Sequence, residues 1–305
     1  MVDYISLFSK YSFFDIRYNE LMKNHTSFKI GGPADIFIIP NSMEELINAI
    51  KIAREAKIPY FIMGNGTNLL VKDGGIRGVV IKVNSNIDKL TVEGEKITAQ
   101  AGALLSNTSK FALENNLTGM EFASGIPGTV GGAVMMNAGA YNGEMKDIVS
   151  KVTVLTKDNE IVTYTNEEMN FGYRKSRVIE EELVVLEVEF SLKRGEYEDI
   201  FYRMQDLNEK RTSKQPLELP SAGSTFKRPE GHFAGQLIDK AGLRGLRYKD
   251  AQVSQKHCGF IVNLGNATYK DISTLIKVVQ KTVKDVHGVD LELEIKVVGE
   301  DLEWK

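Results

Sequence analysis

The chain has 305 residues, of which 42% are apolar and 26% are charged, and its net charge is −3. This length exceeds one typical hydrophobic core and predicts two domains, while the charge gives no general affinity for nucleic acid. No apolar run approaches the roughly 20 residues that span a bilayer, and Met1–Glu20 does not resemble a secretion signal. The single cysteine, Cys258, excludes an internal disulfide, so we expect a cytoplasmic protein.

The first part of the chain predicts short strands with two helices between them. A helix is expected from residue 43, because Ser42 and Glu45 have capping-box spacing and apolar residues then recur at helical period as far as Pro59. The other elements expected here are strands at 60–63 and 79–83, a hairpin of 90–93 with 96–101, and a helix at 104–115.

The second part predicts a further hairpin, two strands and three helices. Their expected ranges are a hairpin of 152–155 with 160–164, strands at 184–192 and 259–263, and helices at 196–211, 234–241 and 272–286. The last helix should end at Gly288 and present one apolar face made of Ile272, Leu275, Ile276, Val279, Val283 and Val286. Alternating apolar residues predict a strand at 291–298. Because strands and helices do not alternate regularly, the pattern favours an α+β fold over a Rossmann sheet. We expect the domain boundary within or just after the polar helix.

The densest glycine segment lies at residues 125–140. It places Gly125, Gly128, Gly131 and Gly132 within eight positions and continues into Asn137-Ala138-Gly139-Ala140. Glycines at this density let backbone N–H groups approach a pyrophosphate. No complete G-x-G-x-x-G and no P-loop occurs, which argues against Rossmann and kinase sites. By itself this block is a tight loop, but a second glycine loop at residues 64–68 predicts a two-sided phosphate clamp.

Several polar residues are candidates for chemistry, although their spacing alone favours structural roles. Arg174 follows Tyr173 and can present a bidentate fork to a carboxylate or phosphate. Ser224 follows a glycine, as in a turn, and no G-x-S-x-G surrounds it, which disfavours a hydrolase. Glu294 lies on the polar face of the last expected strand. The histidines lack metal spacing, so no metal site is expected.

Two basic groups would suit a small polyanion if they converged, although charge alone favours a solvated face. Their members are Lys210, Arg211, Lys214, Lys227 and Arg228 in one group, and Arg174, Lys175 and Arg177 in the other.

Together, segments between Asn24 and Gly299 resemble the UDP-N-acetylenolpyruvoylglucosamine reductase family. The segments that carry the resemblance are Asn24–Gly32, the Gly64 loop, Gly125–Tyr141, Gly172–Ser176, Gly223–Lys227 and Leu291–Ile295. The resemblance implies a vanillyl-alcohol-oxidase-type FAD-binding domain of two subdomains at residues 1–195. A linker helix and a smaller α+β substrate domain would occupy residues 196–305.

The resemblance also implies a cofactor and its ligands. FAD would bind without a covalent bond, and NADPH would be the co-substrate. The residues expected to bind FAD are Gly64, Asn65, Gly66, Thr67, Asn68, Gly125, Ile126, Pro127, Gly128, Val130, Gly131, Asn137, Gly139 and Ala140.

The chemistry implied is reduction of the enolpyruvyl ether of UDP-N-acetylglucosamine in peptidoglycan precursor synthesis. Hydride would pass from N5 of the reduced flavin to the vinyl carbon, Arg174 and Glu294 would stabilise the resulting enolate, and Ser224 would donate the proton. Glu294 would have to be protonated or act through a hydrogen bond, because a carboxylate repels an anion. The expected substrate contacts are Tyr173, Lys214, Lys227, Arg228 and His257.

The sequence departs from the family at three places. The short connection from Ser176 to Val184 matches the branch without a tyrosine-bearing insertion, His257 replaces a glutamine, and Arg228 replaces an asparagine found in some members. Two alternatives stay open: another FAD-dependent oxidase or dehydrogenase of the same fold, and a non-catalytic nucleotide-sugar-binding flavoprotein. We expect a monomer without nucleic-acid or membrane partners.

Overall fold

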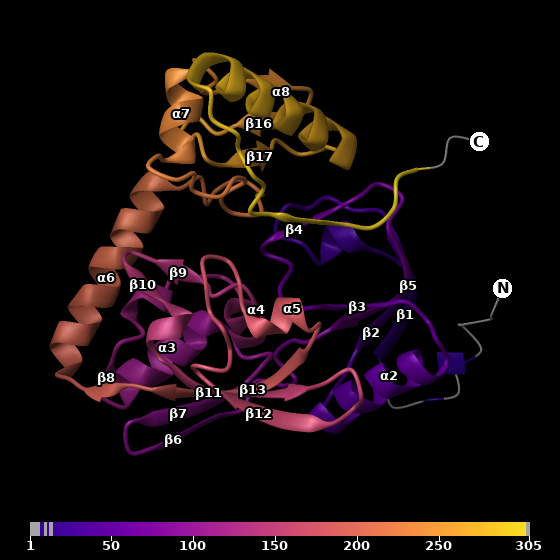
Figure 1. Ribbon diagram of the computed structural model, residues 1–305, viewed down its shortest axis with the longest axis vertical. Helices are drawn as coiled ribbons and strands as arrows, with labels where there is room; N and C mark the ends of the chain where they lie inside the picture. The colour runs from indigo at the N-terminus through magenta and orange to yellow at the C-terminus, as the bar shows by residue number, and fades with distance from the viewer. Residues whose placement is uncertain (1–6, 9–10, 12–14, 303–305) are drawn as a thin grey trace. The chain divides into compact units, whose positions relative to one another are not determined.

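The computed structural model describes residues 7–8, 11 and 15–302, which form two compact units (Figure 1). Unit 1 holds the described residues up to Ile16 together with Ile38–Asn65 and Val80–Arg211. Unit 2 holds Arg17–Phe37, Gly66–Val79 and the described residues from Thr212 onward. Both units are discontinuous in sequence, whereas a single boundary near residue 195 was expected. The division into a cofactor domain and a substrate domain remains a proposal.

Unit 1 is built on a five-stranded antiparallel sheet with the order β12-β11-β13-β7-β6. Its strands are β6 (Leu90–Glu93), β7 (Lys96–Gln100), β11 (Val149–Leu155), β12 (Ile161–Thr165) and β13 (Val184–Ser191). Alternate residues of the central strands are fully buried, among them Val152, Val154, Val188 and Phe190. Two helices of unit 1 are α3 (Leu105–Glu114) and α4 (Val130–Met135), of which α4 packs against β7 and β13 (Figure 1). The expected hairpins and the helix at 104–115 are therefore confirmed.

A second sheet has the order β1-β2-β5-β3. Its strands are β1 (Asp15–Leu21), β2 (Pro33–Ile39), β3 (Tyr60–Met63) and β5 (Ile76–Lys82), and helix α2 (Met43–Glu55) follows β2 in the chain. Ser42 Oγ accepts from the amide of Glu45 at 3.2 Å, as its capping position predicts. The Glu45 carboxylate accepts from the amide of Asn41 instead of closing the capping box on Ser42.

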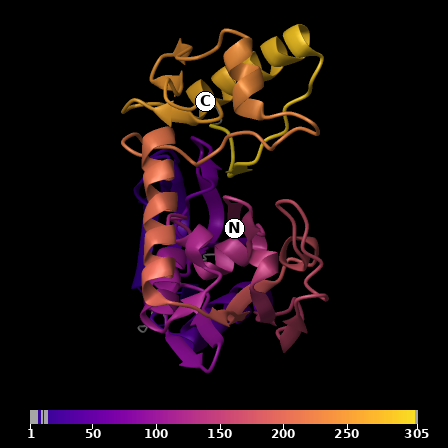
Figure 2. The ribbon, with the colours of Figure 1, turned by 90° about the vertical axis from the view of Figure 1, so that its left-hand side faces the viewer.

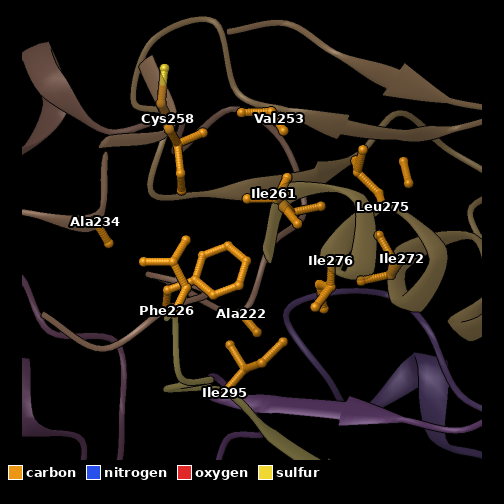
Figure 3. Packing of buried hydrophobic residues seen from close by; sticks show 14 of the residues in the cluster. Ala222, Phe226, Ala234, Val253, Cys258, Ile261, Ile272, Leu275, Ile276 and Ile295 are labelled. Atoms are coloured by element: carbon orange, nitrogen blue, oxygen red, sulfur yellow. The ribbon is translucent and has the colours of Figure 1, made fainter. Parts of the chain in front are cut away.

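Unit 2 contains a three-stranded antiparallel sheet and two helices that pack together (Figure 1; Figure 2). The elements are α7 (Ala234–Lys240), β15 (Arg247–Tyr248), β16 (Ala251–Val253), β17 (Ile261–Asn263) and α8 (Tyr269–His287). Their apolar faces enclose one core, in which Phe226, Ile261, Ile276 and Ile295 lie close together (Figure 3). Strand β4 (Leu69–Val71) pairs in parallel with β18 (Lys296–Val298).

The remaining elements are short. They are η1 (Met22–Asn24), β8 (Leu117–Thr118), η2 (Glu121–Ala123), β9 (Gly139–Ala140), β10 (Gly143–Glu144), η3 (Met145–Asp147), α5 (Arg177–Glu180) and β14 (Lys193–Arg194), besides the long helix α6 (Tyr197–Lys214). None of the described helices is long and apolar enough to cross a membrane.

Two details of the expected C-terminal region were wrong. The strand expected at 291–298 is regular only from Lys296, because the preceding residues follow the Ser224 loop through an isolated bridge between Phe226 and Leu293. Val286 was expected on the apolar face of α8 but is 57% exposed, since it lies in the last turn of the helix, away from the core.

Helix α8 yields a stability prediction. Thr268 Oγ1 accepts from the amide of Asp271, whose carboxylate accepts from the amide of Thr268. We expect Thr268→Ala to lower the free energy of unfolding by about 1 kcal/mol in urea, because both bonds of this cap are disturbed. Thr274→Ala is the control, since its exposed hydroxyl only bonds to a carbonyl within the same helix. Equal losses in the two variants would contradict the prediction.

Candidate functional site

Within unit 1, Gly64 and Asn65 of the first glycine-rich loop lie beside the second glycine-rich loop. Asn65 Nδ2 donates to the carbonyl of Pro127 at 3.1 Å. A Cβ at Gly64 would lie 2.3 Å from Thr129 Oγ1, which is itself the N-cap acceptor of α4. Only glycine fits at position 64, because the cap hydroxyl of the other loop occupies the space of a side chain.

Several amides in these loops have no acceptor among the described residues. They are the amides of Gly64, Asn65, Gly66, Thr67, Asn68, Gly125, Gly128 and Thr129. Gly66 and Thr129 are buried residues, and a buried polar group without a partner costs about 1–3 kcal/mol. Within unit 1, which contains Gly64, Asn65, Gly125, Gly128 and Thr129, an anion with several acceptor oxygens would satisfy these donors. These residues are therefore compatible with the pyrophosphate of FAD.

Other residues expected to bind the cofactor use their amides to hold the glycine block in shape. The amide of Ile126 donates to Ala123, that of Val130 to Ala103, and that of Gly131 to Ala101. Gly139 and Ala140 form β9, which pairs with β10 across a turn. Pro127 has no amide hydrogen and contributes its carbonyl to Asn65.

Arg174 sits on a tight turn that is anchored to the glycine block. Asn137, which is fully buried, donates from Nδ2 to the carbonyl of Gly172 at 3.0 Å, and Ser176 Oγ donates to the carbonyl of Met135 at 2.8 Å. Arg174 has a φ of +55°, a conformation that is costly for a side chain of its size. Its guanidinium carbon lies 4.9 Å from the ring centre of Tyr173. The chain thus holds this arginine in a strained conformation beside the expected cofactor loop.

In unit 2 the backbone brings Ser224 and Glu294 together. The amide of Glu294 donates to the carbonyl of Thr225 at 2.9 Å, directly after Ser224. Asn68, the last residue of the first glycine loop, donates from Nδ2 to the carbonyl of Glu294 and accepts at its own carbonyl from the amide of Lys296. The hydroxyl of Ser224 makes no hydrogen bond among the described residues and is available to a ligand. Thus the bonds of Glu294 tie its backbone to the segment that carries Ser224 and to Asn68.

The surroundings of His257 favour the neutral form of its imidazole, which can donate one hydrogen bond. Burial lowers the pKa of its imidazole, and the nearby charge of Arg244 lowers that pKa further. Its Nδ1 accepts from the amide of Gly259 at 3.1 Å, which places the remaining ring proton on Nε2. The ring also packs edge-on against Phe260. Near neutral pH, this histidine therefore offers one N–H, as the amide of a glutamine does.

The other expected substrate contacts are cationic or aromatic residues at the surface of their own units. Lys227 pairs with Glu292 at 3.0 Å, and the guanidinium of Arg228 lies 3.9 Å from the ring centre of Phe233. Lys214 is exposed at the end of α6, and Tyr173 is 52% exposed. Arg174 and Tyr173 belong to unit 1, whereas Ser224 and Glu294 belong to unit 2. In the described part of the chain, no group of three His, Cys, Asp or Glu residues is placed to hold a metal ion.

Sequence reasoning missed the residues that support this arrangement of Ser224, Glu294 and Asn68. The amide of Ser27 donates to the carbonyl of Gly66, and its hydroxyl donates to the carbonyl of Ser221 at 2.6 Å. Asn263, which is fully buried, donates from Nδ2 to the carbonyl of Phe28 and from its amide to that of Pro220. The segment Asn24–Gly32 is part of the family resemblance, but its residue spacing predicted no role for Ser27. In the structure, Ser27 holds the glycine loop and the Ser224 loop together.

The sequence matches two family models. Residues 34–165 match an FAD binding domain, and residues 215–298 match the C-terminal domain of UDP-N-acetylenolpyruvoylglucosamine reductase. The acceptor-free amides and these matches define the class of the protein, an FAD-dependent oxidoreductase with an α+β fold. The predicted fold class and cofactor are therefore confirmed.

Curated relatives extend the match over nearly the whole chain. The UDP-N-acetylenolpyruvoylglucosamine reductase of Caldanaerobacter subterraneus subsp. tengcongensis is 58% identical over 282 residues, 92% of this chain and 93% of the relative. That of Clostridioides difficile is 52% identical over 98% of both chains. The crystal structure of the reductase from Thermus caldophilus aligns with a TM-score of 0.81 and 38% identity, covering 93% of this chain and 99% of the other. This chain belongs to the UDP-N-acetylenolpyruvoylglucosamine reductase family.

The contact between the two glycine loops predicts that a larger side chain at position 64 reduces cofactor binding. We expect Gly64→Ala to be purified with less bound FAD, because its Cβ would displace Thr129 Oγ1 from the α4 cap. Gly132→Ala is the matched control, since its Cβ would meet only Thr129 Oγ1 at 3.4 Å. The ratio of flavin absorbance to protein absorbance measures occupancy. Equal occupancy in both variants would argue against a shared loop geometry.

The hydrogen bonds of Ser27 predict that loss of its hydroxyl disturbs the position of the Ser224 loop. We expect Ser27→Ala to slow reoxidation of the reduced flavin by substrate by about tenfold, as one lost hydrogen bond to a positioned loop implies. Flavin reduction by NADPH should be unchanged, and Ser27→Thr, which keeps the hydroxyl, should restore most of the rate. Stopped-flow absorbance separates the two half-reactions. Slowing of both to the same extent would indicate a general structural defect instead.

Proposed function

We propose that this chain reduces the enolpyruvyl ether of UDP-N-acetylglucosamine to UDP-N-acetylmuramate, with NADPH as the reductant, in peptidoglycan precursor synthesis. The observation that carries the proposal is the joint placement of Ser224 and Glu294 beside Asn68 of a cofactor loop, in a chain that belongs to the reductase family. We further propose that it acts as a cytoplasmic monomer. A single, buried cysteine is in keeping with a reducing compartment.

The reaction adds one hydride and one proton across the vinyl group of the substrate. FAD, held by this chain and reduced by NADPH, would supply the hydride for the methylene carbon. The amides of the two glycine loops would hold the pyrophosphate of that cofactor, and Gly64 keeps the loops in contact. The protein's own task is then to bind the substrate, stabilise negative charge on it and deliver the proton.

Arg174 would supply the charge stabilisation. As hydride adds to the methylene carbon, negative charge spreads from the adjacent carbon onto the substrate carboxylate. A guanidinium remains charged at every physiological pH and matches both oxygens of a carboxylate. Because the turn of Arg174 is anchored through Asn137 and Ser176, the charge is placed before the substrate arrives. Such preorganisation stabilises the transition state more than the ground state.

Ser224 would donate the proton to the carbon that bears the ether oxygen and the carboxylate. A serine hydroxyl is a weak acid, so its position relative to the accumulating charge must compensate. Its neighbour Thr225 fixes that position, because its amide donates to Gly259 and its Oγ1 accepts from the amide of Ile261. Glu294, bonded through its own amide to Thr225, would stabilise the same intermediate by a hydrogen bond. Solvent then returns the proton to the serine.

The cationic residues of unit 2 would bind the diphosphate of the substrate. Lys214, Lys227 and Arg228 offer permanent charge, and Tyr173 offers an aromatic face and a hydroxyl. His257 would donate from Nε2 to an uncharged oxygen of the substrate, because its lowered pKa keeps it neutral. The replacement of a glutamine by this histidine is conservative in hydrogen bonding, since both side chains present an N–H donor.

The Ser224→Ala variant tests the assignment. We expect its flavin to be bleached by NADPH at the normal rate, whereas reoxidation by the enolpyruvyl nucleotide should slow by about 100- to 10,000-fold, the range of general acid catalysis. Anaerobic stopped-flow absorbance measures both steps. Ser273→Ala, on the exposed face of α8, is the control. Normal reoxidation in Ser224→Ala would refute the proton-donor role, and failure of the unchanged protein to reoxidise with this nucleotide would refute the proposed function.

A further inference from the structure

Arg211, near the end of α6, lies against the start of the glycine block within unit 1. A Cβ at Gly125 would lie 2.9 Å from Cδ and 3.7 Å from Nε of Arg211. Asn208 Oδ1, one turn earlier on the same helix, would lie 2.8 Å from that Cβ. The absence of a side chain at Gly125 therefore makes room for the arginine. It also brings the guanidinium next to the loop whose amides lack acceptors.

The charge of Arg211 is poorly solvated and has no acidic partner. Among the described residues it makes no ion pair and no hydrogen bond. Burial lowers the pKa of its guanidinium, and the charge of the neighbouring Tyr141 acts in the opposite direction without reversing that shift. Its neighbours on α6 behave differently, since Lys210 pairs with Asp206 at 2.7 Å and Arg203 pairs with the same carboxylate at 3.0 Å. Removing a charge from water without a counter-charge is unfavourable. An anion bound beside Arg211 would therefore be stabilising.

We propose that Arg211 is a ligand of the FAD pyrophosphate and supplies the positive charge that the backbone amides of the glycine block lack. This inference rests on the FAD binding of the proposed function. The pyrophosphate is favoured over the isoalloxazine ring because it is charged in every state of the cofactor, and a partly buried, permanently charged guanidinium is best matched by a permanent counter-charge. The amides of Gly125, Gly128 and Thr129, which have no acceptor among the described residues, belong to the same loop. A guanidinium beside them can bind phosphate oxygens bidentately.

Replacement of the charged side chain of Arg211 by an apolar side chain of similar length tests the proposal. Arg211→Met should weaken FAD binding by about 10- to 100-fold, as expected for the loss of a charge-assisted contact to phosphate. The Kd is measured by quenching of flavin fluorescence when FAD is added to flavin-free protein. Its dependence on salt concentration should become less steep, because one ionic contact is lost. Lys210→Met removes an exposed, paired cation from the next position and should leave the Kd unchanged.

Two further measurements separate a cofactor ligand from a structural residue. Without FAD, Arg211→Met should melt at the same temperature as the unchanged protein or higher, because a desolvated, unpaired charge has been removed. Arg211→Lys should bind FAD with intermediate affinity, since it keeps the charge but not the fork. At saturating FAD, the midpoint potential of the flavin in Arg211→Met should equal that of the unchanged protein, since the pyrophosphate is remote from the redox-active ring.

An unchanged Kd for FAD in Arg211→Met would overturn the inference, as would a weakened Kd accompanied by a lower melting temperature of the flavin-free protein. A lower midpoint potential would place Arg211 at the isoalloxazine ring and would also overturn it. These outcomes leave the proposed function intact when the unchanged protein still binds FAD and turns over the enolpyruvyl nucleotide. Failure of the unchanged protein to do so would refute the proposed function itself.

Discussion

Several backbone amides of the two glycine loops have no acceptor among the described residues, and neighbouring contacts hold these loops in place. Glycine at position 64 admits the cap hydroxyl of Thr129, Asn65 ties the loops together, and Ser27 fixes the carbonyl of Gly66. None of these contacts uses the loop amides themselves. If the cofactor accepts from these amides, as proposed, its binding would also add to the stability of the fold.

In the proposed function, the same loop would link cofactor binding to chemistry through Asn68. This residue ends the loop and bonds by its side chain to the carbonyl of Glu294, whose amide bonds to Thr225 beside Ser224. A displacement of the loop would be passed by these hydrogen bonds to the residues assigned to proton delivery. The hydride source and the proton source must approach opposite ends of one double bond, so a shared frame limits the error in their relative position.

Sequence reasoning was most successful where a local pattern determines the structure. The hairpin of β6 and β7 and the helix α8 followed from a glycine turn and from a capped apolar stripe. The strand expected at 291–298 was mostly wrong, because alternation of apolar residues shows which residues are buried but not which partner supplies hydrogen bonds. Arg211 belongs to a basic group of the sequence, for which charge alone favoured a solvated face. Its burial against Gly125 depends on two segments far apart in the chain, and spacing cannot reveal such a contact.

In the proposed function, Arg174 and Arg211 would both face a bound anion. Arg174 is held at a φ of +55°, which is backbone strain, and Arg211 is a partly buried cation without an acidic partner among the described residues, which is electrostatically unfavourable. In the proposed function, both arrangements become favourable when negative charge binds beside these residues. Residues that break a local rule of backbone conformation or of charge burial are therefore good candidates for function.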